Sequence, residues 1–408
     1  MPPPASTSIL HRSSPPPPCR MGDIFKPAPK PDSELRKYRL LSPSAGVRVS
    51  PICLGAMSLG DQWTKFMAGK LDVKEAEEYL DYFYKAGGNF IDTANNYQDE
   101  QSEMIVGEWM EKRGIRDDIV LATKFTTFFP NRHAQQWTEK RIGVNYVGNA
   151  KKSLKHSLEA SLKKLRTDYI DLLYVHWWDH STSIPELMQN LAEVVRSGNV
   201  LYLGVSDTPA WVVAQANEYA RAHALPQFVV FQGLYNYAVR DMERDIIPMC
   251  RNNGMSIAPW GIMGQGQFKP AEDLAKKGLR GGATEQSAAN KKICDALEEV
   301  AKEIGGNTKL AHVGMAWARQ MYSATFPILG GTSIEHLQSN INALSLTLTD
   351  EQMAKLDKAA PFDHGFPTGL FGVDPRLLPE QSPQSPLLLQ VCISTWHGAG
   401  HVKYPKAV

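Results

Sequence analysis

The stretch Asn-Phe-Ile-Asp-Thr-Ala-Asn-Asn-Tyr, residues 89–97, decides how the rest of the chain is interpreted. Its first three residues follow a Gly-Gly pair and predict a short strand that ends at Asp92. A polar turn then leads to Tyr97. The segment by itself also fits a strand that ends in an Asx turn, with Tyr97 on the surface of an ordinary loop. A shared function for the carboxylate and the phenol therefore depends on matching groups from other strands.

Short apolar segments of the same kind recur between residues 36 and 360 and alternate with helical patterns. Each segment is nearly continuous in hydrophobicity, as expected of strands that are buried on both faces. The predicted strands are 49–54, 89–92, 119–124, 170–176, 201–206, 228–232, 256–260 and 325–330. The helical patterns are 73–86, 149–165, 185–196, 209–222, 241–252, 289–303 and 310–321.

This alternation predicts an α/β fold, a single-domain (β/α)8 TIM barrel over residues 36–360. A doubly wound open sheet is the alternative. It is less favoured because no G-x-G-x-x-G follows the first strand: Gly55 and Gly60 are too far apart and lack a third glycine. Long irregular segments at 125–148 and 361–408 are expected to cap the active face, the second as a C-terminal extension.

The first 35 residues differ in composition from the rest of the chain. They are rich in Pro and Ser, with four consecutive prolines at 15–18. Such a segment has too little apolar surface to order itself, so we predict a disordered N-terminal extension over residues 1–35. It also lacks the apolar core of a secretory signal.

The overall composition argues against several classes of function. Lys and Arg number 44 against 43 Asp and Glu, so no basic excess indicates binding to nucleic acid. No apolar stretch is long enough to span a bilayer, which predicts no membrane partner. The 5 cysteines are scattered and form no C-x-x-C pair. They predict a reducing compartment, the cytoplasm, rather than a disulfide framework. No feature of the sequence indicates an oligomeric state.

Titratable groups end several of the predicted strands. In a barrel the active site lies at the carboxyl ends of the strands. The second strand ends at Asp92, with Tyr97 just beyond it, the third at Lys124 and the fourth at His176. Each group alone is more often structural, but four of them on one rim favour a functional site. The later strands end in Ser206-Asp207, Gln232, Trp260 and Gly330-Gly331.

These residue types suit the transfer of a proton to or from an oxygen. A phenol titrates near ~10, and a nearby Lys124 ammonium lowers the pKa of Tyr97 by stabilising the phenolate. Asp92 would hold the lysine in place. Carbonyl reduction by a hydride donor needs such an acid. No second carboxylate pairs with Asp92, so glycoside hydrolysis is weakly supported, and no His/Asp cluster has the spacing of a metal site.

The sequence resembles the aldo-keto reductases over residues 36–370, and most closely their fungal branch of aryl-alcohol dehydrogenases and norsolorinic acid reductases. The resemblance rests on LGAMSLG at 54–60, GGNFIDTANNY at 87–97, LATK at 121–124, DYIDLLYVHWWD at 168–179, LYLGVSDTPAWVV at 201–213, RDMERDIIPM at 240–249 and FPILGG at 326–331. It implies that Tyr97 is the proton donor, that Lys124 and Asp92 lower its pKa, and that His176 orients the carbonyl.

The resemblance also implies an NADP(H) cofactor, with NAD(H) as the alternative. Ser206 and Gln232 match the groups that bind the nicotinamide carboxamide, next to Asp207, where many relatives have Asn. Trp260 matches the aromatic residue that stacks on the nicotinamide ring. The other implied cofactor positions are Gly261, Ile262, Gly264 and Gly266 over the pyrophosphate, and Gly330, Gly331, Thr332, Ser333, His336 and Asn340 at the adenosine end, where a helix N-terminus could hold phosphate.

One departure from the family pattern concerns the 2′-phosphate of NADP. This branch commonly has Gly-Gly-Arg-Lys after the eighth strand, whereas this chain has Gly-Gly-Thr-Ser at 330–333. A guanidinium that binds phosphate through two hydrogen bonds is a main source of affinity, and hydroxyls replace it only partly. We therefore expect weaker discrimination against NAD(H) than in relatives that carry the arginine.

Two functions remain open at this point. The first is an oxidoreductase that interconverts aldehydes or ketones with alcohols, and the intact catalytic set favours it. The alternative is a cofactor-binding sensor subunit, like the channel β-subunits of the same fold, with little turnover. Aromatic residues predicted to line the pocket favour aryl or polyketide-type carbonyls, and the branch implies fungal secondary metabolism. These residues are Trp63, Phe125 and Trp177, together with Phe128, Phe129 and Trp178.

Overall fold

The computed structural model describes residues 26–64, 71–130, 141–269 and 287–372. The contacts within the chain divide it into two units, Met1–Asp32 and Ser33–Val408. The second unit contains the strands and helices that follow. The predicted disorder of the N-terminal extension falls mainly on residues 1–25, which lie outside the described residues. The same holds for residues 373–408 of the predicted C-terminal extension.

Eight parallel strands form the barrel, in the order β10-β3-β4-β5-β6-β7-β8-β9. The barrel closes between β9 and β10, because Ile257 N donates to Ala324 O and Phe326 N donates to Ile257 O, each at 2.9 Å. This closure confirms the predicted barrel over the open doubly wound sheet. The strands are β3 (Cys53–Gly55), β4 (Phe90–Asp92), β5 (Val120–Phe125), β6 (Ile170–Val175), β7 (Val200–Ser206), β8 (Phe228–Leu234), β9 (Ser256–Trp260) and β10 (Ile328–Leu329).

Two of the predicted strands are shorter than the sequence indicated, and one hairpin was missed. The prediction of a strand at 49–54 joined the end of one element to the start of another. Val49 ends β2 (Ala45–Val49), which pairs antiparallel with β1 (Arg39–Ser42), and the first barrel strand begins only at Cys53. Pro51 and Pro327 interrupt the two predicted segments because proline has no N–H to donate to a ladder.

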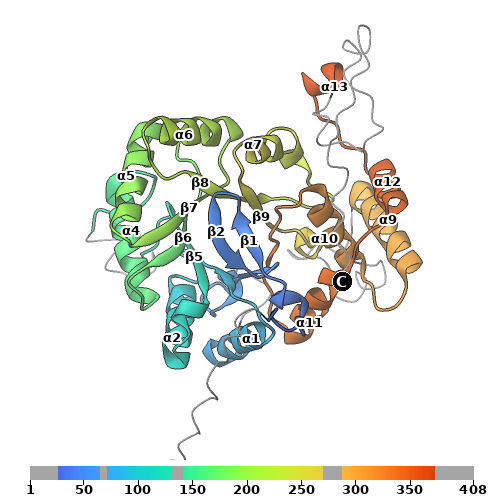
Figure 1. Cartoon of the computed structure of the whole chain (residues 1–408), viewed down its shortest axis with the longest axis horizontal. Coiled ribbons are helices and arrows are strands. Elements are labelled where there is room, and N and C mark those ends of the chain that lie inside the picture. Colours follow the sequence, from blue (N-terminus) through green and yellow to red (C-terminus); the bar gives the residue numbers. More distant parts are fainter. Residues whose placement is uncertain (1–25, 65–70, 131–140, 270–286, 373–408) are drawn as a thin grey trace, which may run out of the picture. The chain divides into compact units, whose positions relative to one another are not determined.

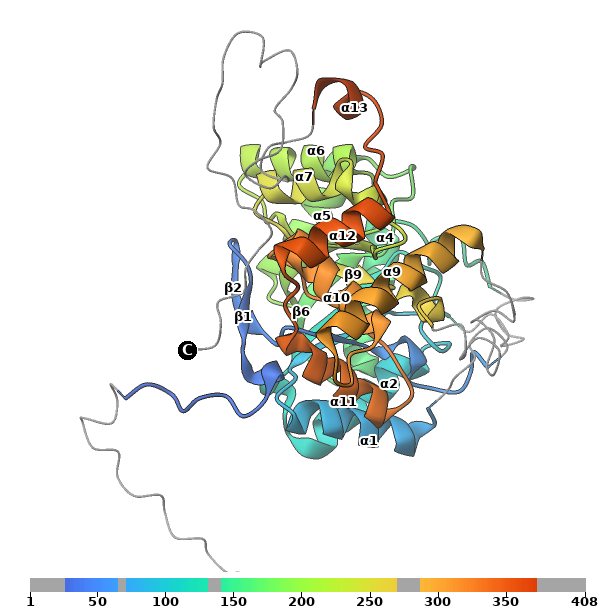
Figure 2. The same cartoon turned by 90° about the vertical axis from the view of Figure 1, so that its right-hand side faces the viewer.

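The hairpin β1–β2 closes the N-terminal end of the barrel. Its side chains Leu41, Ala45 and Val49 share one buried cluster with residues that point inward from the starts of the strands, such as Phe90 and Phe326. Figure 1 shows the hairpin over the centre of the barrel, and Figure 2 shows it at one end. The opposite end of the strands is therefore the one that stays available for a site.

Helices surround the strands (Figure 1). They are α1 (Val73–Lys85), α2 (Gln101–Arg113), α4 (Lys151–Lys164), α5 (Ile184–Arg196), α6 (Ala210–Ala222), α7 (Ile246–Asn252), α9 (Ala288–Ile304), α10 (Leu310–Met321), α11 (Ile334–Asn342), α12 (Asp350–Ala359) and α13 (Thr368–Phe371). Local sequence sets their starts: Asp72 caps α1 through Glu75 N at 2.9 Å, while Glu75 returns a bond to Asp72 N. Such a capping box stabilises a helix by about 1 kcal/mol.

Helix α2 was not among the predicted helices. Its buried face includes Ser102, Glu103 and Gly107 among apolar residues, so the apolar stripe that marks a helix in sequence is broken. Gly107 is required there, because a Cβ would lie 2.4 Å from the carbonyl oxygen of Lys164. Of the polar residues on this face, Glu103 accepts a hydrogen bond from Thr123 of β5.

Alternate residues of each strand face two separate cores. Inside the barrel lie Ala122, Leu172 and Val230. The second core, between the strands and the helices, takes the neighbouring residues, including Leu121 and Leu173. This alternation follows from the two-residue period of a strand. It also decides which residue at each strand end points into the mouth of the barrel.

The described part of the C-terminal extension packs beside the segment that follows β8. Phe362 lies under the guanidinium groups of Arg240 and Arg244, at 5.3 and 4.6 Å from the ring centre. Arg244 also donates to Asp363 O at 2.8 Å. The prediction that the extension covers the active face concerns residues 373–408 as well, so it stays a prediction.

Candidate active site

The four titratable residues predicted from strand ends meet at the C-terminal end of the barrel. Asp92 is the last residue of β4, and Lys124 lies on β5 with its side chain inward. Tyr97 lies in the loop between β4 and α2, and His176 follows β6. The rings of Tyr97 and His176 are 6.0 Å apart, edge to face. The structure therefore brings all four residues together.

The ammonium group of Lys124 connects three of these elements. Its Nζ atom donates to Asp92 Oδ2 at 2.6 Å, to Thr93 O at 2.7 Å and to Tyr97 Oη at 3.2 Å. An ammonium has three donors, and all three are used. Lys124 is fully buried. Burial alone would lower the pKa of Lys124, but Asp92 and Tyr97 outweigh it and raise that pKa, so the group stays charged.

Burial raises the pKa of the Tyr97 phenol, whereas it lowers the pKa of the Lys124 ammonium. Removal from water raises the pKa of the phenol above its ordinary value, Lys124 opposes this, and Asp92 adds to it. Lys124 does lower the pKa of Tyr97, as expected. Desolvation is the larger effect, so the pKa of Tyr97 is raised overall. Tyr97 carries its proton at neutral pH, as a general acid must.

His176 is neutral at physiological pH. Burial, followed by the nearby Lys124 charge, lowers the pKa of its imidazole to about 3. Protonation would place a second positive charge in a buried site next to the Lys124 cation, which is unfavourable, so the neutral form is favoured. His176 can therefore act only as a neutral hydrogen-bond donor or acceptor toward a substrate.

The predicted carboxamide-binding residues occupy two different environments. Ser206 ends β7, and its buried hydroxyl lies near the Asp207 carboxyl group but makes no hydrogen bond of good geometry among the described residues. A buried unpaired hydroxyl is uncommon and marks a place for a ligand group. Gln232, on β8, instead donates from Nε2 to Asp92 Oδ1 at 3.0 Å. The sequence missed this contact, through which Gln232 also holds the carboxylate that anchors Lys124.

Asp207 and Trp260 meet beside this site. Trp260 ends β9 and donates from its indole nitrogen to Asp207 Oδ1 at 3.4 Å. Asp207 is exposed and has a φ of 41°, in the left-handed region, and its backbone N donates to Gln232 O at 3.1 Å. Although the residue as a whole is exposed, neighbouring atoms keep water from its carboxyl group, and this desolvation raises the pKa of Asp207 above the ordinary value.

The loop after β9 has the backbone of an anion-binding turn. Gly261, Gly264, Gln265 and Gly266 all have φ between 51° and 83°. At Gly264 a Cβ would lie 2.4 Å from the Phe268 ring, so only glycine fits. Such a turn can direct backbone N–H groups to one side, where they bind phosphate oxygens, although the N–H of Gly264 already donates to Gly261 O at 2.9 Å. Ile262, by contrast, is fully buried, so its implied contact with a cofactor stays a prediction.

The predicted adenosine end lies at the start of α11. Ser333 caps this helix by accepting from His336 N at 3.2 Å, and it donates to Glu335 Oε2 at 2.6 Å. Gly330, Thr332 and His336 are exposed, and Gly331 and Asn340 are partly buried. In place of a guanidinium, this segment presents a hydroxyl at Thr332 and a carboxylate at Glu335.

Two of the three predicted substrate-binding residues reach the site. Trp63 lies 6.1 Å from the Tyr97 ring, edge to face, and donates from Nε1 to Asp99 Oδ1 at 2.9 Å. Trp177 is half-buried and follows His176 directly. Phe125 is different: it is fully buried in the core between strands and helices, because Lys124 takes the inward position of β5. We therefore do not retain Phe125 as a substrate contact.

The loop that carries Tyr97 has an unusual backbone. Gln98, Asp99 and Glu100 have φ of 51°, 51° and 82°, so three consecutive residues other than glycine are left-handed. Such conformations cost on the order of 1 kcal/mol or more each and persist where the surroundings impose them. The buried Gln98 side chain contributes by donating to Met57 O at 2.8 Å and accepting from Trp63 N at 2.8 Å.

A second buried cation, Lys164, binds the loop that carries Tyr97, and sequence reasoning missed it. Lys164 of α4 donates to Asn95 O at 2.9 Å and pairs with Glu103 at 2.8 Å and Glu100 at 3.1 Å. Glu103 also accepts from Thr123 Oγ1 at 2.5 Å. The available signal was a helical row of polar residues in α4, at positions 153, 157, 161 and 164, all of which are buried.

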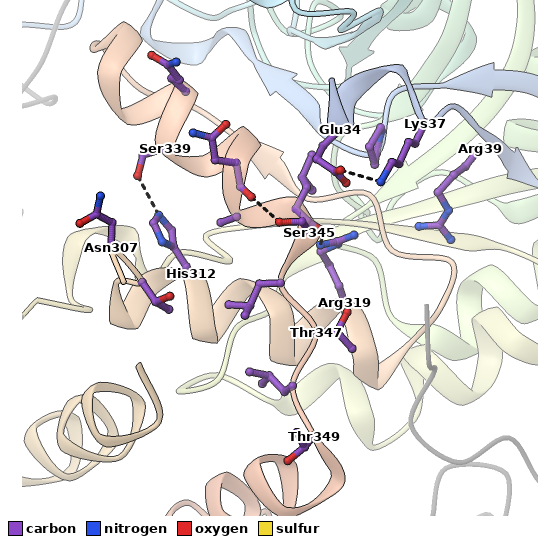
Figure 3. Close-up of a pocket in the computed structure, with 18 of the residues that line it drawn as sticks. Glu34, Lys37, Arg39, Asn307, His312, Arg319, Ser339, Ser345, Thr347 and Thr349 are labelled. Carbon is purple, nitrogen blue, oxygen red and sulfur yellow. Dashed lines mark hydrogen bonds and ion pairs between the residues drawn. The ribbon is translucent and has the colours of Figure 1, made fainter. Parts of the chain in front are cut away.

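A groove of about 1620 Å³ lies elsewhere on the molecule, lined by α10, α11 and the segment before α12 (Figure 3). Several of its polar groups bind one another: Lys37 Nζ donates to Glu34 Oε1 at 2.7 Å, and His312 Nε2 lies 3.2 Å from Ser339 Oγ. None of the four residues of the site lines it. Within the described residues, no group of three or more His, Cys, Asp or Glu side chains is placed to hold a metal. No helix of the described ranges has the length and apolarity needed to cross a membrane.

Comparison with known proteins agrees with this geometry. The sequence profile of the aldo/keto reductase family matches residues 51–361. A putative aryl-alcohol dehydrogenase of Saccharomyces cerevisiae is 49% identical over 374 residues, which cover 89% of this chain and 97% of that protein. Norsolorinic acid reductase B of Dothistroma septosporum is 50% identical, over 81% of this chain and 83% of its own. An aryl-alcohol dehydrogenase [NADP(+)] of Phanerodontia chrysosporium is 46% identical, with 86% and 92% covered. The chain belongs to the aldo/keto reductase family.

Proposed function

We propose that this enzyme interconverts aryl or polyketide-type aldehydes and ketones with their alcohols, using NADP(H), with Tyr97 as the general acid and base. The observation that carries the proposal is the Lys124 ammonium, which binds Asp92 and the Tyr97 oxygen at the open end of the barrel. The names of the similar proteins, aryl-alcohol dehydrogenases and norsolorinic acid reductases, support the substrate class.

The residues present fit a nicotinamide cofactor. The unpaired Ser206 hydroxyl offers a hydrogen bond to a carboxamide, and the left-handed turn from Gly261 to Gly266 offers N–H groups to a pyrophosphate. The half-buried Trp260 presents an indole beside them. When bound, the cofactor supplies the hydride.

The protein groups manage the proton and the orientation of the carbonyl. Because Lys124 donates to the Tyr97 oxygen, the phenolic proton is free to bond a substrate oxygen. In reduction, Tyr97 gives this proton to the oxygen as negative charge develops there, and Lys124 stabilises the phenolate that remains. In oxidation the same phenolate takes the proton back. His176 directs a neutral hydrogen bond to the same oxygen.

The direct test is a turnover assay with a panel of aromatic and aliphatic aldehydes and ketones, each offered with NADPH and with NADH. We expect consumption of the reduced cofactor with equal formation of alcohol, fastest for aromatic carbonyls. Tight cofactor binding without turnover on any carbonyl would overturn the proposal and favour a cofactor-binding sensor.

The start of α11 predicts weak selection for the 2′-phosphate of NADPH. Thr332 offers a hydroxyl, and the carboxylate of Glu335 lies at the same helix start, where it opposes a phosphate. We expect Thr332→Arg to tighten NADPH binding by about 10–100-fold, as a charge-assisted hydrogen bond does. Ser333 stays in place because it caps the helix.

Cofactor titrations followed by fluorescence measure this effect, with NADH as the internal control. The affinity for NADH should not change, and Thr332→Gln, which adds length without charge, should leave both affinities near those of the wild type. If the wild type already prefers NADPH as strongly as a relative with arginine at this position, the prediction is wrong.

The cysteines support a reducing compartment. Cys53, Cys250 and Cys294 are buried free thiols. Disulfides form mainly in oxidising compartments. On this ground we propose a cytoplasmic location.

A further inference from the structure

We propose that Thr127 is a positioning residue that fixes the tautomer of His176, so that Nε2 carries the proton and donates to the carbonyl oxygen of the substrate. The assignment rests on the proposed function for its chemical meaning, but the tautomer itself can be measured without substrate. Thr127 follows the end of β5, three residues after Lys124.

The direction of the hydrogen bonds starts at Trp177. Its Nε1 atom lies 3.0 Å from Thr127 Oγ1, and an indole nitrogen can only donate. Thr127 Oγ1 therefore accepts this bond. The same oxygen lies 3.2 Å from His176 Nδ1. The one hydroxyl proton of Thr127 then has Nδ1 as its acceptor.

The opposite tautomer, with the proton on Nδ1 donated to Thr127 Oγ1, leaves the Thr127 hydroxyl proton without an acceptor among the described residues. The other tautomer gives this proton an acceptor within the protein, and Thr127 is half-buried, so that tautomer is favoured. The pairing that uses both protons leaves Nδ1 as an acceptor, so the ring proton must lie on Nε2.

A strained backbone places Thr127 beside the ring. Thr126 has a φ of 94°, which is a genuine outlier for a β-branched residue. The outlier is held on several sides. Thr126 Oγ1 accepts from Asn149 Nδ2 at 2.8 Å and from His176 N at 3.3 Å. Asn95 Nδ2 donates to Thr127 O at 2.9 Å. Strain retained at such a position points to a functional constraint.

The tautomer has a chemical consequence. Among the described residues, Nε2 of His176 has no partner, so it remains for a ligand. With the proton on Nε2, the neutral ring donates to a carbonyl oxygen and orients it toward Tyr97. With the proton on Nδ1, Nε2 would present a lone pair to that oxygen and repel it. A wrong tautomer in a catalytic site lowers the rate even when the geometry is kept.

The test is nitrogen NMR of protein labelled with 15N-histidine, recorded without cofactor or substrate. The His176 signals are identified by their loss in His176→Gln. We expect a protonated Nε2 and an unprotonated Nδ1 in the wild type. Thr127→Val, which keeps the shape and removes the hydroxyl, should give a mixture of tautomers, and Thr127→Ser should restore the wild-type pattern.

Kinetics give the second measurement. Thr127→Val should lower kcat/KM for carbonyl reduction by about 10–100-fold, as loss of a partner that orients a functional histidine does. The dissociation constant of the cofactor should stay unchanged, and Thr127→Ser should recover most of the rate. A purely structural role would instead lower the melting temperature and the cofactor affinity together.

The outcomes separate this inference from the proposed function. A wild-type His176 protonated on Nδ1, or an unchanged pattern in Thr127→Val, overturns it whatever the protein catalyses. The wild-type spectrum decides the tautomer even if Thr127→Val does not fold. Failure to reduce any carbonyl, with the expected NMR pattern, would remove the proposed function and leave the tautomer assignment standing.

Discussion

Replacing Tyr97 with phenylalanine should abolish nearly all carbonyl reduction, with a loss of about 10²–10⁴-fold in kcat, while the cofactor still binds. The substitution removes the phenolic proton donor that lies next to the Lys124 ammonium. The fold should survive, since Lys124 keeps its bonds to Asp92 and to Thr93 O. Steady-state rates with an aromatic aldehyde and cofactor titration by fluorescence measure the two effects.

The pH dependence of the wild type gives a matched check on this role. Burial raises the pKa of Tyr97 above its usual value of about 10. Reduction needs the protonated phenol, so its rate should be flat through neutral pH and fall only in alkaline solution. Alcohol oxidation needs the phenolate and should rise with pH over the same range. The pKa of His176, about 3, predicts no step between pH 5 and 8.

Loss of this alkaline limb in Tyr97→Phe, together with the lost rate, would identify Tyr97 as the titrating group. Retention of more than a tenth of the wild-type turnover would contradict the assignment. The Tyr79→Phe variant is a control, because Tyr79 is a buried tyrosine of α1 in the outer core.

The second large effect is expected for Lys124→Met, which should lower both activity and stability. The variant leaves the Asp92 carboxylate, 3% exposed, without its cation. An uncompensated buried charge costs about 3–5 kcal/mol of the free energy of unfolding. The Lys124→Met substitution also removes the ammonium that lowers the pKa of Tyr97, so any remaining alcohol oxidation should need a higher pH.

The double variant Lys124→Met/Asp92→Asn separates these two effects. It removes both charges, and replacement of a whole buried pair is often close to neutral for stability. Gln232 can still bond the new side chain. We expect most of the stability to return in denaturant unfolding, while the activity stays lost. A double variant as unstable as the single one would show that the ion pair is not the source of the loss.

Much of the barrel could be predicted because its signals are local. The short apolar runs that end at Asp92 and Lys124 are visible in sequence, and the geometry of parallel strands brings their ends to one edge. The hairpin β1–β2 was missed because Pro51 lies between two apolar runs that read as one. Helix α2 was missed because it buries Glu103, which pairs with a lysine some sixty positions away.

Side-chain direction at the strand ends was only partly predictable. Lys124 and Phe125 are neighbours at the end of β5, and both were expected at the mouth of the barrel. Because successive residues of a strand point to opposite faces, only one of them can be there. Lys124 takes the inward position because Asp92 and the Tyr97 oxygen compensate its charge, and Phe125 packs outward in the apolar core.

The sequence by itself determined the barrel, the position of Asp92, Tyr97, Lys124 and His176 at or just beyond the ends of its strands, and the absence of an arginine at position 332. It did so because these depend on residue type and on the order of strands. Only the tertiary structure decided the acidity of Tyr97, the second role of Gln232 and the contact of Thr127 with His176. Burial and hydrogen-bond direction depend on distances between segments far apart in the chain, and those distances exist only once the barrel has closed.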